Sequence, residues 1–188
     1  MKVLAIAVVL AAALVVLAGV AVALRARRIK ARHRAVFSTE LPALDPGRER
    51  VVDAPRALYH GTRFADGVAL LAPRWRDRCI GDLWCTDQAI FLRREEGGDP
   101  LALPLAWVLE ATLIRAYAAL AGKDLPMLRV RWRRGGEELA TDFSLPGGMA
   151  NLEKLRREIH LRQAEGSALA ALAPLLARTP EPGAGTKE

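Results

Sequence analysis

The chain has few of the residues that build disulfide, metal or catalytic sites. Its 188 residues include two cysteines and three histidines. The spacing of Cys79 and Cys85 is neither that of a thioredoxin-like pair nor that of a zinc-ligand pair, and it predicts two reduced, buried thiols. There is also no Gly-rich phosphate loop, no His-x-x-x-His pair and no nucleophile elbow. The sequence therefore assigns no catalytic residue, no metal site and no cofactor.

Acidic residues are absent from the first 34 positions, and this absence locates the charge of the chain. The formal net charge is +7. Seven basic residues lie within residues 1–34, and the 21 basic residues that remain are balanced by 21 acids. A groove that follows nucleic-acid phosphates needs a basic excess within the folded domain. We therefore predict no nucleic-acid partner.

One long hydrophobic run, residues 3–24, contains no charge. As a helix it would be about 33 Å long, enough to cross a hydrocarbon core of about 30 Å. It predicts a single-pass transmembrane helix. A cleaved signal peptide, with Ala21-Val22-Ala23 as the cleavage site, is the alternative, but the apolar core is too long for one and the basic cluster follows it.

A basic segment follows directly, and we call it the collar: Arg25, Arg27, Arg28, Lys30, Arg32 and Arg34. Basic residues favour the cytoplasmic side, so we expect an inner-membrane protein with its N-terminus outside and its C-terminal domain in the cytoplasm. The expected partner of the collar is the anionic leaflet of the lipid bilayer, unless the collar only fixes topology.

The rest of the chain divides by pattern. Residues 35–56 are rich in proline and charge and predict a linker. Residues 57–164 predict seven short antiparallel strands followed by one amphipathic helix, an α+β domain. The apolar stripe of that helix is Met149, Leu152, Leu155 and Ile159. Residues 165–188 predict a short helix over 168–178 and a disordered tail from Thr179.

Part of this domain resembles a known superfamily. The residues that carry the resemblance are the hairpin Gly81-Asp82-Leu83-Trp84-Cys85-Thr86-Asp87-Gln88-Ala89-Ile90-Phe91-Leu92, then Leu103-Pro104-Leu105 and the strand Val108–Arg115. They resemble the pleckstrin-homology (PH)-like superfamily, and the arrangement is similar to small bacterial proteins with one N-terminal helix and a PH-like domain of the GRAM type. The resemblance implies a seven-stranded sheet or barrel closed by a C-terminal helix. It also implies a binding or scaffold module without enzymatic activity.

Many PH-like domains bind phosphorylated headgroups through basic residues on and between the first strands. The corresponding candidates here are Arg63, Arg74, Trp75, Arg76 and Arg78. Guanidinium groups suit phosphate oxygens. The competing interpretation is a solvated strand edge, with Asp66, Asp77 and Asp82 forming local ion pairs. A second arginine stripe, 129–134, faces acidic residues of the next strand and predicts cross-strand charge pairs.

One enzyme-like pattern remains. His60-Gly61-Thr62 resembles the NAD-gripping strand of ADP-ribosyltransferases, and Tyr117 and Glu138 follow in the order that this family requires. We rank this below two binding functions. The first is interaction with an unidentified membrane or cytosolic protein, and the second is binding of anionic lipid.

Overall fold

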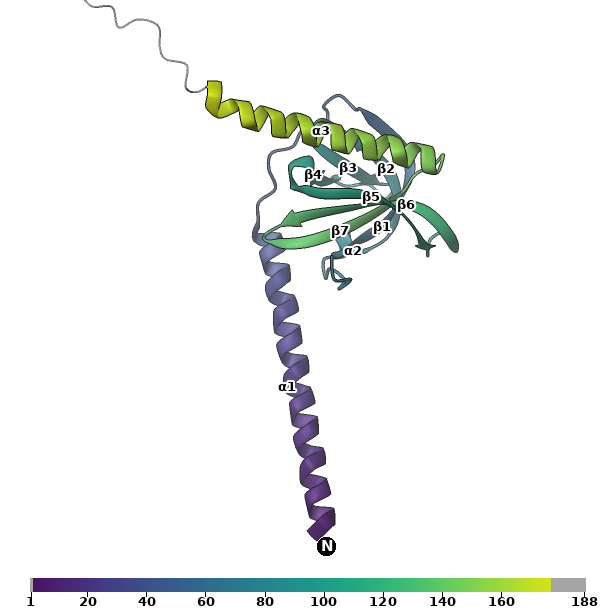
Figure 1. Cartoon of the computed structure of the whole chain (residues 1–188). Coiled ribbons are helices and arrows are strands. Elements are labelled where there is room, and N and C mark those ends of the chain that lie inside the picture. The colour runs from purple at the N-terminus through teal and green to yellow at the C-terminus, as the bar shows by residue number, and fades with distance from the viewer. Residues whose placement is uncertain (1, 177–188) are drawn as a thin grey trace, which may run out of the picture. The chain divides into compact units, whose positions relative to one another are not determined.

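The computed structural model describes residues 2–176, with side chains described for 13–166 and 168. The predicted disordered tail from Thr179 lies outside the described residues. The elements in order are α1 (Lys2–Ser38), β1 (Val52–Phe64), α2 (Pro73–Arg76), β2 (Cys79–Cys85), β3 (Ala89–Arg94), β4 (Leu101–Pro104), η1 (Leu105–Trp107), β5 (Val108–Ala118), β6 (Lys123–Arg134), β7 (Glu137–Ser144) and α3 (Met149–Leu176). Figure 1 labels the α-helices and the strands.

The chain forms two compact units. The first, the helical unit, consists of Met1–Glu40 together with Arg134–Glu137, the turn between β6 and β7. The second, the sheet unit, consists of Leu41–Arg133 and Glu138–Glu188.

The prediction of a transmembrane anchor needs correction. Within the described side chains, no helix has an apolar stretch long enough to cross a membrane. In α1 the described apolar part is 13–24, and the charged collar follows at once. The structure therefore does not support the predicted single-pass helix over 3–24 or the predicted inner-membrane localisation with the N-terminus outside.

The sheet unit contains one seven-stranded sheet in the order β4-β3-β2-β1-β7-β6-β5. β1 pairs with β2 and β7, β2 with β3, β3 with β4, and β5 with β6, all in antiparallel register. β4 and β5 follow one another in sequence but lie at opposite edges, so the sheet is open. The prediction of a closed barrel is therefore wrong. β4 has only four residues and ends at Pro104, which has no N–H to donate, and η1 then turns the chain away.

β1 is longer than predicted because it begins at Val52, not at residue 57. Two irregularities bend it, one between Ala54 and Ala57 in the pairing with β2 and one between Tyr59 and Thr62 in the pairing with β7. A strand bent in this way can pair with β2 along one part and with β7 along another. The second irregularity contains Gly61, which is important for the site.

α3 covers part of the sheet (Figure 1) and contacts η1, β1 and β5. Leu152, Leu155 and Ile159 of the predicted stripe are fully buried, whereas Met149 is half exposed. Burial of each such aliphatic side chain contributes about 1.5–3 kcal/mol. The helix continues through Gly166 to Leu176, so the predicted end near Ala164 and the separate helix over 168–178 are wrong. A single glycine costs only about 1 kcal/mol in a helix, and the Ala- and Leu-rich sequence after it favours continuation.

Candidate functional site

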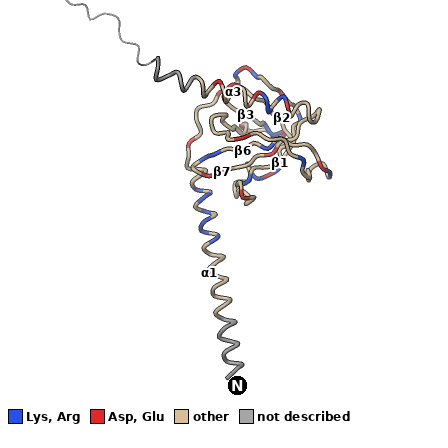
Figure 2. The backbone as a smooth tube through the Cα atoms, viewed as in Figure 1, with Lys and Arg blue, Asp and Glu red and all other residues tan. Residues whose placement is uncertain are grey.

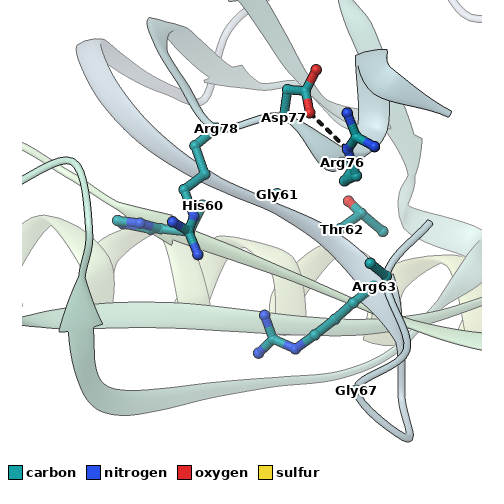
Figure 3. A pocket seen from close by; sticks show the side chains of 9 residues that line it. His60, Gly61, Thr62, Arg63, Gly67, Arg76, Asp77 and Arg78 are labelled. Carbon is teal, nitrogen blue, oxygen red and sulfur yellow. Dashed lines mark hydrogen bonds and ion pairs between the residues drawn. The ribbon is translucent and has the colours of Figure 1, made fainter. Parts of the chain in front are cut away.

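An open pocket of about 410 Å³ lies beside β1, on the side where α2 packs. Figure 3 shows its side chains, which come from β1, the loop after β1, α2 and the connection to β2. The lining residues are His60, Gly61, Thr62, Arg63, Gly67, Ala69, Arg76, Asp77 and Arg78. Three arginines and one aspartate therefore contribute a net positive charge, with a histidine among them.

The three arginines differ in their partners. Arg63 bonds Asp142 at 2.7 Å, and Arg76 bonds Asp77 at 2.8 Å. Arg78 is exposed, and among the described residues it forms no ion pair. An exposed guanidinium that forms no ion pair can donate its N–H groups to an incoming anion.

Asp142 is buried behind the pocket and binds Arg63, one of the pocket's three arginines. Its side chain is 4% exposed and accepts hydrogen bonds from Arg63 at 2.7 Å and from Arg129 at 2.8 Å. Burial alone would raise the pKa of the Asp142 carboxyl, but the hydrogen bonds from Arg129 and Arg63 outweigh it and hold that pKa below its usual value. The carboxylate is therefore charged at neutral pH and neutralised by its two partners. Cross-strand pairing of the arginine stripe is confirmed here and in the bonds from Arg131 and Arg133 to Glu138.

The α2 turn lies close against β1 because Gly61 has no side chain. Gly61 has a φ of +91°, and a Cβ built there would lie 2.4 Å from the carbonyl oxygen of Arg76. Arg94 of β3 also holds the turn, because its guanidinium donates to the backbone carbonyls of Arg74 and Asp77. The position of Arg76 and Arg78 thus depends on one glycine and one remote arginine.

A chain of buried hydrogen bonds joins the sheet to the same turn. The Tyr59 hydroxyl donates to the carbonyl oxygen of Trp75, and Thr62 Oγ1 lies 2.7 Å from the Tyr59 hydroxyl. Thr141 Oγ1 lies 2.7 Å from Thr62 Oγ1 and accepts the Trp132 indole N–H at 2.9 Å. Since each hydroxyl has one proton, the bonds run in one direction, from Trp132 through the two threonines to Tyr59 and Trp75. Each proton then has an acceptor within the sheet unit.

His60 lines the pocket and is half-buried. Burial lowers the pKa of its imidazole, the Asp142 carboxylate acts in the opposite direction, and Arg78 and Arg63 lower it further. The ring is therefore neutral at pH 7.

Of the five candidates that the sequence named, Arg63, Arg76 and Arg78 line the pocket. Arg74 is exposed and donates to the backbone carbonyl of Asp99. Trp75 packs on Trp132, with ring centroids 5.5 Å apart. Sequence reasoning placed Asp142 opposite the arginine stripe, but it missed the bond from Arg63, which lies 79 residues away. It considered His60 only for an enzyme.

The three residues of the ADP-ribosyltransferase pattern are not brought together. The Ala65 amide bonds the Glu138 carbonyl, so Glu138 lies five residues along β1 from His60, roughly 17 Å. Glu138 is also bonded by Arg131 and Arg133. Tyr117 pairs with Asp124 on the outer hairpin and is 67% exposed.

The collar belongs to the helical unit, where Figure 2 shows basic residues along the second half of α1. Arg25, Arg27, Arg28, Lys30 and Arg34 are exposed, while Arg32 bonds Glu137 at 2.7 Å. One member of the collar thus has a structural partner within its own unit.

Among the described residues, no group of three His, Cys, Asp or Glu side chains could hold a metal ion.

Comparison with known proteins gives little. No family model and no curated protein matches the chain. One solved structure, titled "The 8S snRNP Assembly Intermediate", aligns with 9% identity over 80% of this chain and 97% of that chain, with a TM-score of 0.42. At that TM-score neither fold nor function is inferred from the likeness.

Proposed function

We propose that the chain is a binding module without enzymatic activity, and that its ligand places an anionic group in the pocket beside β1 and α2. The observation that carries the proposal is Arg78, an exposed guanidinium without an ion-pair partner among the described residues. Arg63 and Arg76 share its pocket, so an anion there meets several charge-assisted donors.

The ligand that we propose first is a partner protein that carries an acidic or phosphorylated side chain. Anionic lipid is the alternative, because a headgroup phosphate offers the same oxygens to the same arginines. The resemblance to PH-like domains supports a binding module of either kind. The separation of His60, Tyr117 and Glu138 argues against the transferase.

The pocket can be tested by calorimetric titration of the full chain with inorganic phosphate. We expect Arg78→Gln to weaken binding about tenfold, the equivalent of one lost charge-assisted hydrogen bond. Arg115→Gln is the matched control, because Arg115 is an exposed arginine of β5 outside the pocket. Equal binding by Arg78→Gln and the native chain would contradict the site.

A second experiment separates the two ligand classes. The full chain is mixed with a phosphoserine peptide, and separately with phosphatidylcholine vesicles that contain or lack phosphatidylserine. Arg78-dependent binding of the peptide alone supports the protein partner. Arg78-dependent binding of the anionic vesicles alone supports the lipid alternative and rejects our first choice.

A further inference from the structure

The hydrogen bonds of His60 fix which of its nitrogens carries the proton. His60 Nε2 lies 3.0 Å from Ser144 Oγ, and Ser144 Oγ donates to the carbonyl oxygen of Pro126 at 3.0 Å. A serine hydroxyl has a single proton, so Ser144 can only accept from His60. The neutral imidazole therefore carries its proton on Nε2 and leaves Nδ1 without one.

Charged groups surround the ring from several elements. They are Arg63 on β1, Arg78 between α2 and β2, and Asp142 on β7, with Arg129 of β6 bonded to Asp142. The Asp142 carboxylate is already matched by Arg63 and Arg129. Near neutral pH the pocket wall thus holds an uncharged imidazole beside cations, and that imidazole can gain a proton as the pH falls.

We propose that His60 makes anion binding in this pocket proton-controlled, with tighter binding under mildly acidic conditions. Protonation adds one positive charge to the pocket wall and converts Nδ1 from an acceptor into a donor. Ser144 remains the acceptor for Nε2, so the ring need not turn. The inference rests on the proposed function, since it concerns the same pocket.

Linkage makes the effect reciprocal. If protonated His60 favours the anion, then the bound anion favours protonated His60 by the same free energy. An anion in the pocket must therefore raise the pKa of His60, which the surrounding arginines and burial hold low in the free protein.

The test uses sulfate as the probe, because sulfate keeps both of its charges across the pH range and any pH dependence then belongs to the protein. The full chain is titrated calorimetrically at about pH 7.5 and about pH 5.5. We expect the native chain to bind sulfate at least about threefold more tightly at the lower pH. His60→Gln should bind equally at both pH values. His160→Gln, in which an exposed histidine of α3 is changed, should behave like the native chain.

The outcomes are distinguishable. Absence of sulfate binding at both pH values overturns the proposed function and this inference together. Binding of equal strength at both pH values overturns only the control by His60, and so does a pH dependence that persists in His60→Gln.

A second measurement does not depend on whether His60→Gln folds. NMR titration of the His60 imidazole in the native chain, with and without sulfate, should show a higher pKa with the anion present. An unchanged pKa in sulfate that is shown to bind would overturn the proposal.

Discussion

At the scale of single residues, Gly61 decides whether the α2 turn can approach β1. Its φ of +91° already disfavours any other residue, and the Arg76 carbonyl occupies the space that a side chain would need. The sequence contains Gly61 within His60-Gly61-Thr62, where it suggested a nucleotide motif. In the structure the same glycine has a packing role.

We predict that Gly61→Ala lowers the free energy of unfolding by more than about 2 kcal/mol, because strain at positive φ adds to a clash with backbone. Chemical denaturation monitored by circular dichroism measures this. Gly97→Ala is the matched control, since Gly97 has a φ of +88° and nothing within 4 Å of the added carbon. A loss no larger than that of the control would show that the contact with Arg76 does not matter.

Asp142 is the buried carboxylate that pairs with Arg63 and Arg129. We predict that Asp142→Asn lowers the free energy of unfolding at pH 7 by about 2 kcal/mol, because Arg63 and Arg129 lose a buried ionic partner but remain about one-third exposed.

The pH dependence gives a sharper test of Asp142. The pKa of Asp142 is lower in the folded chain than its ordinary value of 3.8. Its stabilisation is therefore fully present above 3.8 and is lost as the pH falls through the lower, folded value. The difference between the native chain and Asp142→Asn in urea should shrink below pH 3.8. Asp124→Asn, at an exposed position on β6, should be as stable as the native chain both at pH 7 and below pH 3.8.

At the scale of elements, the hydrogen-bond chain from Trp132 to Trp75 couples the middle of the sheet to α2. A turn of four residues has little stability of its own. Its position is determined by contacts from elsewhere, namely the Tyr59 hydroxyl, Arg94 and the close approach at Gly61. The arginines of the pocket are therefore positioned by the sheet.

We predict that Tyr59→Phe lowers the free energy of unfolding by about 1–3 kcal/mol, because the Trp75 carbonyl loses a donor and the Thr62 hydroxyl loses its acceptor. Hydrogen exchange should show faster amide exchange within 75–77. Tyr117→Phe serves as the control, since that tyrosine is mostly exposed. Unchanged exchange over 75–77 would mean that the bond does not hold α2.

At the scale of the whole molecule, the chain divides its charge and its packing between two units. The helical unit includes the β6–β7 turn, where Arg134 donates to the Thr39 carbonyl at 2.7 Å and lies over the Phe37 ring. Gly135 allows this turn to approach α1, because a Cβ there would lie 2.1 Å from the Ala35 carbonyl oxygen. The end of α1 is thus held within its own unit by backbone contact as well as charge.

We predict that Gly135→Ala removes this contact and speeds amide exchange over residues 33–38 of α1, whereas Gly136→Ala does not. Both glycines have positive φ, but an added carbon at Gly136 meets nothing within 4 Å. The pair therefore separates backbone strain from the contact with Ala35. Equal exchange in the two variants would contradict the role of that contact.

The sequence by itself determined what depends on local pattern. Short stretches of alternating apolar residues predicted antiparallel strands within residues 57–164, and β6 and β7 are two of them. Apolar spacing predicted the buried stripe of α3, and residue counting located the excess charge in the first 34 positions. These features depend on periodicity and composition, which can be read from the sequence without knowing the tertiary contacts.

Only the tertiary structure decided the features that depend on the order and register of the strands. The sheet is open because β4 and β5, which follow one another in sequence, lie at its opposite edges. The site required partners that are 79 and 84 residues apart, Arg63 with Asp142 and His60 with Ser144. Pairing at such separations depends on how strands bulge and align, and a one-residue shift in register would turn each of these side chains to the other face of the sheet.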